Sequence, residues 1–273
     1  MADEEHQEDQ APRTSHWFVR GLAATGRGIA VGGKWVGSKA AEAYRAVDPD
    51  VQRHLIQVPL MAYTLFDKRD AEVQPSEPDG YPPLVFVHGY GGNRGNFLPM
   101  SWLFWLAGRK RSYRVGFAAG RSIEEQAVDL VEFVERVCQI NQAPRVDLVA
   151  HSMGGLVARI ALQELSLAER VQTFVSLAAP HHGTYPARYA NTEVLKCLRP
   201  GSELVARLAK GQIPESVRVV CMWSRNDLFV LPPESALLDG AERVDLTPFT
   251  HYSYLIAPRC FEALRGVLMP DAI

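Results

Sequence analysis

Residues 150–155, Ala-His-Ser-Met-Gly-Gly, constrain the fold of this chain more than any other stretch. A run typical of a buried strand precedes them at 145–149, and a run typical of a helix follows. A serine on so sharp a turn has a strained backbone and presents its hydroxyl above the edge of a sheet. Its neighbours must be small, because larger side chains would collide with the adjacent strand and helix, and Ala150 and Gly154 meet that demand. The stretch therefore predicts a strand, a tight turn with Ser152 at its tip, and a helix.

The spacing of this turn matches the G-x-S-x-G nucleophile elbow, with alanine in the first position. Because small residues flank serine often by chance, the motif alone has a second interpretation, in which Ser152 only caps the N-terminus of the helix. The other parts of a catalytic site, elsewhere in the chain, have to decide between the two.

A glycine-rich turn at 88–92, His-Gly-Tyr-Gly-Gly, follows a predicted apolar strand at 84–87. Glycines let a substrate approach the backbone closely and let N–H groups turn outward. Such a loop supplies one N–H donor to a developing oxyanion, and the residue after the nucleophile supplies the other. We expect Tyr90 and Met153 to provide these donors. Taken alone, the turn also fits an ordinary tight loop.

Candidates for an acid and a base lie downstream of the serine, in the order serine, acid, histidine. Asp227 follows a predicted buried strand at 217–223, and functional residues of parallel sheets gather at the carboxyl ends of strands. Glu234 and Asp239 are the next candidates for the acid. His251 is the only histidine after Asp227, so it is the expected base.

Serine, histidine and aspartate in this order suit covalent catalysis. A serine hydroxyl is a weak nucleophile near neutral pH, and an imidazole within hydrogen-bond reach takes its proton and later returns it to the leaving group. The carboxylate fixes the imidazole tautomer and stabilises the imidazolium. With two oxyanion donors, such a triad forms an acyl-enzyme that water then hydrolyses.

On these residues the chain resembles the α/β-hydrolase superfamily, and within it bacterial serine esterases and lipases. The resemblance rests on several segments and residues: 87–92, 149–155, 177–184, Asp227 and His251. It implies an α/β-hydrolase fold and an esterase or lipase that cleaves carboxylic esters of lipophilic acyl groups. Acyltransferase, thioesterase and lipid-amidase activities use the same triad and stay open. So does a non-enzymatic, membrane-associated binding protein on a hydrolase scaffold.

The alternation of predicted strands and helices indicates an α/β fold with a mostly parallel central sheet and helices on both faces. A capping box at Ser122 and Glu125 begins a long helix predicted to end near Ile140. Residues 80–273 are the predicted α/β-hydrolase domain. An insertion at about 182–216 interrupts the alternation, and we expect it to form a cap or lid over an apolar cleft. A pair of ordinary connecting helices is the alternative.

The N-terminal part of the chain differs in character from this domain. Residues 1–15 are polar and acidic and are expected to be a disordered tail. Residues 16–79 are predicted to form a helical extension and a connector. Within them, 16–47 interleaves basic and apolar residues. Two hypotheses stay open for 16–47: it packs on the hydrolase body as an extra helical layer, or it rests on an anionic membrane surface.

An apolar site for the acyl chain is expected beside the serine. The residues predicted to contact the substrate are Phe97, Trp102, His151 and Tyr185. A hydrophobic pocket discriminates by only about 1–3 kcal/mol per methylene, so we expect broad tolerance of acyl-chain length.

Composition and charge argue against several other classes. The net charge of −2 makes no case for nucleic-acid binding, and no apolar run is long enough to span a bilayer. The first residues lack the basic start and apolar core of a signal peptide, so the expected location is the cytoplasm, with peripheral membrane contact as an alternative. No carboxylate cluster near Asp227 and His251 suggests a calcium ion, so neither a metal nor a cofactor is expected. The natural ester and the oligomeric state are left open.

Overall fold

The computed structural model describes residues 73–270. The predicted tail at 1–15, the segment 16–47 and the rest of the extension up to residue 72 therefore lie outside the described residues, as do residues 271–273.

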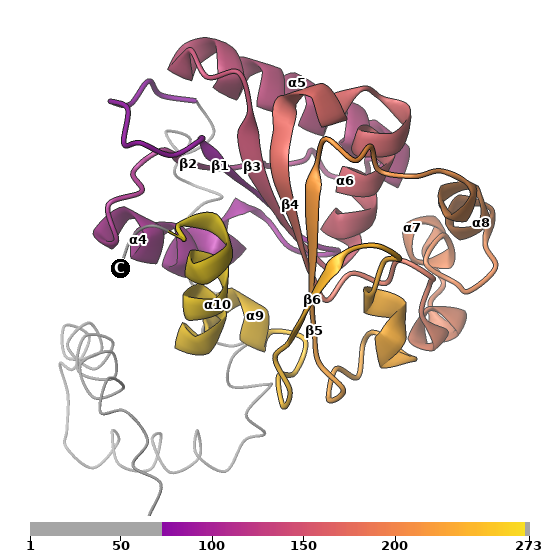
Figure 1. Cartoon of the computed structure of the whole chain (residues 1–273). Coiled ribbons are helices and arrows are strands. Elements are labelled where there is room, and N and C mark those ends of the chain that lie inside the picture. Colours follow the sequence, from indigo (N-terminus) through magenta and orange to yellow (C-terminus); the bar gives the residue numbers. More distant parts are fainter. Residues whose placement is uncertain (1–72, 271–273) are drawn as a thin grey trace, which may run out of the picture. The chain divides into compact units, whose positions relative to one another are not determined.

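A six-stranded sheet runs through the centre of the described region (Figure 1). Its strands are β1 (Leu84–Val87), β2 (Ser112–Arg114), β3 (Val146–His151), β4 (Val171–Leu177), β5 (Arg218–Trp223) and β6 (Glu242–Asp245). The spatial order is β2-β1-β3-β4-β5-β6, and every neighbouring pair is parallel. The prediction of a mostly parallel central sheet is confirmed.

The strand order changes direction beside β1. From β1 the chain moves to one side to form β2, and it then crosses back to form β3 on the other side of β1. The loops that leave the carboxyl ends of β1 and β3 consequently diverge, and open α/β sheets bind ligands in the crevice at such a point. The glycine-rich turn at 88–92 and the turn that carries Ser152 both lie there.

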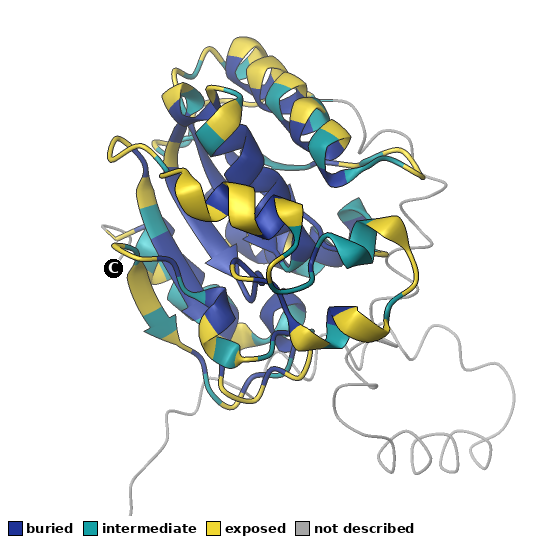
Figure 2. Ribbon diagram, turned by 90° about the vertical axis from the view of Figure 1, so that its right-hand side faces the viewer, coloured by how far each residue is buried: buried dark blue, intermediate teal, exposed yellow. Residues whose placement is uncertain are grey.

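Helices cover both faces of the sheet, as predicted. Those on one face are α5 (Ile123–Asn141), α6 (Met153–Glu164) and α8 (Glu203–Lys210); those on the other are α4 (Leu98–Leu106), α9 (Ser253–Ile256) and α10 (Pro258–Leu268). In β1, Val85 and Val87 enter the core of the first face, whereas Leu84 and Phe86 enter that of the second. Since successive side chains of a strand point to opposite faces, a strand covered on both sides is apolar throughout. Figure 2 shows these buried strands between helices that are exposed on their outer sides.

Short helical elements connect these layers: η4 (Arg94–Phe97), η5 (Leu167–Arg170), η6 (Tyr185–Tyr189), α7 (Glu193–Lys196) and η7 (Pro233–Ala236). At the start of α5, the Ser122 hydroxyl accepts a hydrogen bond from the Glu125 N–H, and the Glu125 carboxylate accepts one from the Ser122 N–H. The predicted capping box is therefore present.

The predicted insertion at 182–216 divides into two parts. In α8, Leu204 and Leu208 are buried in the same core as α5 and α6, so this part is a connecting helix of the body. The part at 183–199 lies beside the loop after β5, because the Tyr185 N–H donates to the carbonyl of Leu231 at 2.9 Å. Ala187 and Leu198 of this part are also buried in that core, but its bond to Leu231 places it beside the loop at the carboxyl end of β5, and it remains the candidate cap.

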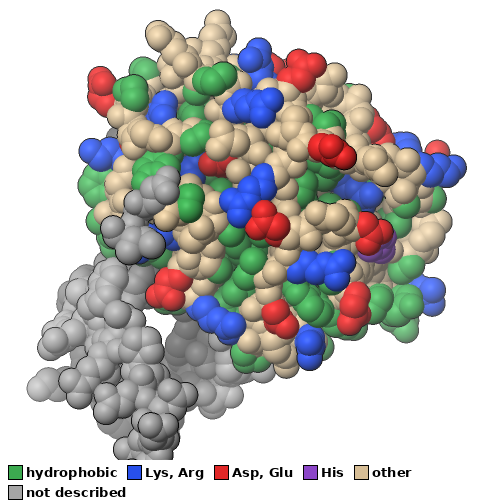
Figure 3. Space-filling model, viewed as in Figure 1, with side chains coloured by type: hydrophobic (Ala, Val, Ile, Leu, Met, Phe, Trp, Pro, Cys, Tyr) green, Lys and Arg blue, Asp and Glu red, His purple; other side chains and the backbone are tan. Residues whose placement is uncertain are grey.

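The surface carries both signs of charge. On the face drawn in Figure 3, Lys and Arg side chains alternate with Asp and Glu, as the net charge of −2 suggests. None of the helices within residues 73–270 has the length and apolar character needed to cross a bilayer.

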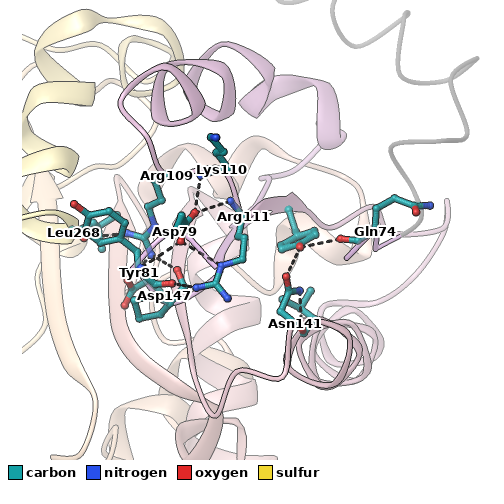
Figure 4. Close-up of polar contacts among 12 residues, drawn as sticks. Gln74, Asp79, Tyr81, Arg109, Lys110, Arg111, Asn141, Asp147 and Leu268 are labelled. Carbon is teal, nitrogen blue, oxygen red and sulfur yellow. Dashed lines mark hydrogen bonds and ion pairs between the residues drawn. The ribbon is translucent and has the colours of Figure 1, made fainter. Parts of the chain in front are cut away.

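A buried ion pair joins several segments at the amino ends of the strands (Figure 4). Arg109 is completely buried, and its guanidinium donates to Asp147 Oδ2 at 2.6 Å, to the carbonyl of Pro82 at 2.7 Å and to that of Leu268 at 3.0 Å. These contacts tie the segment before β1 to the start of β3 and to the end of α10. Asp79 nearby accepts hydrogen bonds from the N–H groups of Lys110 and Arg111. The cluster holds together the end of the sheet opposite to Ser152.

Candidate active site

The turn between β3 and α6 holds Ser152 in an unusual backbone conformation. Its φ is 55° and its ψ is −129°, a combination that is rare and strained for a residue with a side chain. Neighbouring backbone leaves little room: a Cβ on Gly154 would lie 2.5 Å from the carbonyl oxygen of His88. The predicted strained serine and the demand for a small residue at Gly154 are confirmed.

A chain of hydrogen bonds joins Ser152, His251 and Asp227. The Ser152 hydroxyl lies 2.9 Å from Nε2 of His251, and Nδ1 of His251 lies 2.9 Å from Oδ2 of Asp227. Because a carboxylate only accepts, His251 donates from Nδ1, and its Nε2 is then the acceptor for the serine hydroxyl. His251 and Asp227 are both buried, while Ser152 is partly exposed.

Two backbone groups hold Asp227 in place. Its Oδ1 accepts hydrogen bonds from the N–H of Phe229 at 2.8 Å and from the N–H of Val230 at 3.2 Å. With Oδ1 occupied in this way, Oδ2 faces His251. The other two candidate acids, Glu234 and Asp239, are exposed.

The glycine-rich turn after β1 passes directly over the serine. A Cβ on Gly89 would lie 2.9 Å from the Cβ of Ser152 and 3.1 Å from the carbonyl oxygen of His151, so only glycine fits at this contact. Tyr90 follows Gly89 on the same turn. Met153 is the first residue of α6, and the first N–H groups of a helix have no partner within the helix. The two predicted oxyanion donors thus belong to the two turns that flank the Ser152 hydroxyl.

His151, predicted to contact the substrate, lies beneath the site instead. It is buried, with 4% of its surface exposed, and its Nε2 lies 2.9 Å from the carbonyl oxygen of His251. The two imidazole rings are 4.7 Å apart. Burial, and then the proximity of His251, hold the pKa of His151 well below its usual value. His151 lies at the end of β3 and points toward the loop that carries His251, which corrects its assignment as a substrate contact.

Phe97, also predicted to contact the substrate, is a core residue. It is fully buried and stacks on Phe86, with ring centroids 4.8 Å apart. A side chain enclosed in this way cannot line an open acyl site, so this assignment is corrected as well. Trp102 on α4 and Tyr185 on η6 are each about half exposed. Of these two, Tyr185 lies beside the loop that follows Asp227, through its hydrogen bond to Leu231.

Leu228 and Phe229 were not among the predicted site residues. The Phe229 ring lies 5.0 Å from that of His251 and is half exposed, and Leu228 is 68% exposed. The signal in the sequence is an apolar pair directly after the candidate acid, where a polar loop is usual. Phe229 thus lies beside the base, and together with Leu228, Tyr90 and Tyr185 on the neighbouring loops it belongs to a set of exposed apolar side chains called here the rim.

Residues 180–184, part of the segment 177–184 on which the resemblance to lipases rests, connect the candidate cap to the body of the fold. His181 is buried, and a hydrogen bond of 2.8 Å joins its Nε2 to the hydroxyl of Ser176 on β4. The Thr184 hydroxyl donates to the carbonyl of Phe229 at 2.8 Å. On the other side, the Tyr90 hydroxyl reaches Thr192 at 3.5 Å. The candidate cap at 183–199 is therefore in contact with both the turn after β1 and the loop after β5.

Comparisons with known proteins agree with this architecture. The family described as "PGAP1-like alpha/beta domain" matches residues 111–199, which include Ser152. The chain is 32% identical over 142 residues to an sn-1-specific diacylglycerol lipase, ABHD11, of Xenopus tropicalis, covering 50% of this chain and 41% of the relative. It is 31% identical over 129 residues to a GPI inositol-deacylase of Candida albicans, covering 40% of this chain and 33% of the relative. The chain thus spans less than half the length of either curated relative.

Solved structures share the fold at low sequence identity. The mature form of Bacillus licheniformis lipase BlEst2 superimposes with a TM-score of 0.64 at 16% identity, covering 72% of this chain and 96% of that one. Aspergillus fumigatus lipase B superimposes with a TM-score of 0.62 at 19% identity, covering 69% of this chain and 52% of that one. The chain therefore has the α/β-hydrolase fold that these lipases share.

Proposed function

We propose that this protein is a serine hydrolase that cleaves carboxylic esters of lipophilic acyl groups. The observation that carries the proposal is the hydrogen-bonded series from the Ser152 hydroxyl through His251 to Asp227, at 2.9 Å for each contact. A serine paired in this way with a buried imidazole and carboxylate is equipped for nucleophilic attack on a carbonyl carbon. A scaffold with no catalytic role has no need of this arrangement.

In the proposed reaction, Ser152 Oγ attacks the ester carbonyl while His251 Nε2 takes its proton. The backbone N–H groups of Tyr90 and Met153 stabilise the oxyanion, each by on the order of 3 kcal/mol of barrier. His251 then donates the proton to the departing alcohol, which leaves an acyl group on Ser152. Water, deprotonated by His251, attacks the acyl-enzyme and releases the carboxylic acid. Asp227 stays ionised and orients His251 throughout.

The proposed substrates are lipid acyl esters. The rim offers exposed apolar side chains to an acyl chain, and its member Phe229 lies beside His251, with ring centroids 5.0 Å apart. The two curated relatives are named as a diacylglycerol lipase and a GPI inositol-deacylase. A diacylglycerol and an acylated phosphoinositide are therefore the first natural substrates to test.

The test measures ester hydrolysis and, in parallel, covalent labelling of the serine. The full chain is assayed with p-nitrophenyl esters from acetate to laurate and is reacted with a fluorophosphonate, with the adduct located by mass spectrometry. We expect turnover, with the label on Ser152. Ser152→Ala should lose both signals, whereas Ser216→Ala, at an exposed serine outside the site, should keep both. Unchanged turnover in Ser152→Ala refutes the proposal.

Transfer to other acceptors uses the same acyl-enzyme and is the alternative activity. Product analysis with added alcohols, thioesters and lipid amides separates the cases, since a transferase makes a new ester at the expense of free acid. Hydrolysis as the main outcome supports the proposal as stated. A predominant transfer product would mean that an alcohol, and not water, attacks the acyl-enzyme.

Contact with a membrane surface is a separate hypothesis that concerns residues 16–47, outside the described residues. Its basis is the interleaved basic and apolar sequence there. Liposomes with anionic lipid should co-sediment the full chain more than a chain lacking residues 1–50. Equal sedimentation of the two would remove the membrane contact but leave the hydrolase proposal intact.

A further inference from the structure

Besides the hydrogen bond between the side chains of Ser152 and His251, a second one joins the residue before the nucleophile to the backbone of the base. His151 precedes Ser152 in the chain, and its Nε2 lies 2.9 Å from the carbonyl oxygen of His251. The first contact links the Ser152 hydroxyl to the His251 ring, whereas the second links the end of β3 to the His251 backbone.

The chemistry of this second bond defines the state of His151. A carbonyl oxygen only accepts, so the proton of the neutral imidazole is on Nε2 of His151. The ring is buried, and it also lies near the rings of Tyr252 and Tyr254, at 6.5 Å and 6.3 Å between centroids. It therefore packs against the whole segment that carries His251 into α9.

The charges around His151 favour its neutral form. His251 and His88 are the charged or titratable neighbours that lower its pKa, and burial contributes most. The Asp227 carboxylate accepts a hydrogen bond from Nδ1 of His251. Burial raises the pKa of Tyr254, so this side chain is neutral near pH 7. A neutral donor under His251 does not oppose the imidazolium that forms there during turnover.

We propose that His151 is a positioning residue, which holds the backbone of His251 so that Nε2 of that ring faces the Ser152 hydroxyl. The bond to Asp227 orients the His251 ring, and hydrogen bonds such as the one from the Ser253 N–H to the Thr250 carbonyl shape the loop after β6 locally. The bond from His151 adds a direct tie between the backbone of His251 and the residue next to the nucleophile. This inference rests on the proposed function, since it assigns His151 a part in the same reaction.

In the competing interpretation, His151 only fills space in the core. Two variants distinguish this interpretation from a positioning role. His151→Phe keeps the ring volume and removes the donor, whereas His151→Gln keeps an amide donor near the position of Nε2. A misplacement of about 1 Å can cost on the order of 100-fold in rate. On the full chain with p-nitrophenyl butyrate, we expect kcat of His151→Phe to fall by roughly 10- to 100-fold with KM nearly unchanged. His151→Gln should recover most of that loss.

A readout without turnover accompanies the kinetics. The downfield Nδ1–H proton resonance of His251 in NMR spectra reports its bond to Asp227, and we expect it to be sharp in the wild type and His151→Gln but broadened in His151→Phe. Should His151→Phe not fold, His151→Asn, whose shorter side chain cannot reach the carbonyl, takes its place beside His151→Gln.

The outcomes distinguish this proposal from the one on which it rests. A wild-type chain that neither hydrolyses esters nor takes a fluorophosphonate on Ser152 overturns the proposed function. An active wild type with His151→Phe equal to it in kcat and in the NMR resonance overturns only the role of His151. Equal losses in His151→Phe and His151→Gln also overturn it, because the donor would then not be what matters.

Discussion

Asp227 and His251 are joined by a hydrogen bond of 2.9 Å between Oδ2 and Nδ1, and both side chains are buried. In Asp227→Asn, the amide oxygen can still accept from the N–H groups of Phe229 and Val230, but the group that faces His251 becomes a donor. The imidazole then adopts the wrong tautomer, and we expect kcat to fall by about 10⁴-fold. Glu234→Gln and Asp239→Asn, at the exposed alternative acids, are the matched controls. A comparable loss in either control would move the acid away from Asp227.

The close contact between Gly89 and Ser152 predicts that adding one methyl group at position 89 lowers the rate of hydrolysis. In Gly89→Ala, the new Cβ would lie 2.9 Å from the Cβ of Ser152, so the turn that carries Tyr90 has to move outward. Loss of one oxyanion donor lowers kcat by about 10²- to 10³-fold, and we expect a fall of this size with a smaller change in KM. Gly266→Ala on α10, where a Cβ meets no atom within 4 Å, should keep full activity. Wild-type kcat in Gly89→Ala would mean that the turn takes no part in the reaction.

The rim predicts how the rate depends on the acyl chain. Phe229→Ala removes an apolar surface next to His251, and we expect kcat/KM for laurate esters to fall about tenfold relative to acetate esters. A series of p-nitrophenyl esters measures this ratio. Val128→Ala, an exposed apolar position on α5 away from the site, serves as the control. A uniform fall for all chain lengths would indicate that Phe229 acts on His251 and not on the acyl chain.

The buried ion pair predicts a large effect on stability. Arg109→Met leaves the Asp147 carboxylate buried without its cation, which typically costs about 3–5 kcal/mol of unfolding free energy. Urea unfolding followed by circular dichroism measures the loss. Arg170→Met breaks the exposed pair with Glu135 and should leave the urea midpoint nearly unchanged, because exposed ion pairs contribute little. Equal midpoints for the two variants would contradict the structural role of Arg109.

Three buried histidines predict a loss of stability in mild acid. Burial lowers the pKa of His88, His151 and His181 in the folded chain below their ordinary value of about 6.5. Below pH 6.5 the unfolded chain therefore binds more protons than the folded one, so stability falls as the pH falls, by up to about 1.4 kcal/mol per pH unit for each group.

Urea unfolding at pH 7.5 and pH 5.0 tests this dependence. His181→Gln should reduce the difference between the two pH values by one group's share, whereas Ser216→Ala, at an exposed residue that does not titrate, should retain the wild-type difference. A wild-type chain that is equally stable at both pH values would contradict the assignment.

Several features followed from local sequence because short-range physics decides them. The capping box of Ser122 and Glu125 needs only residues three apart, and the alternation of apolar strands with amphipathic helices is enough to indicate a parallel sheet. The strand–turn–helix motif also indicates a small residue at position 154, although the crowding there comes from the carbonyl groups of Val87 and His88 at the end of the adjacent strand. The order of serine, acid and histidine restricted the base to His251, because no other histidine follows Asp227.

Other features depended on contacts between residues far apart in the chain. Phe97 points into the core, although α4, which it precedes, has no charged residue to show which side faces solvent. The partner of His151 is a backbone carbonyl 100 residues away, and backbone carbonyls leave no trace in side-chain patterns. Sequence alone thus determined the element types, the sheet and the candidate nucleophile and base. Only the folded chain decided which faces are buried and which groups meet Ser152, because these depend on the rotation of each element and the path of each loop.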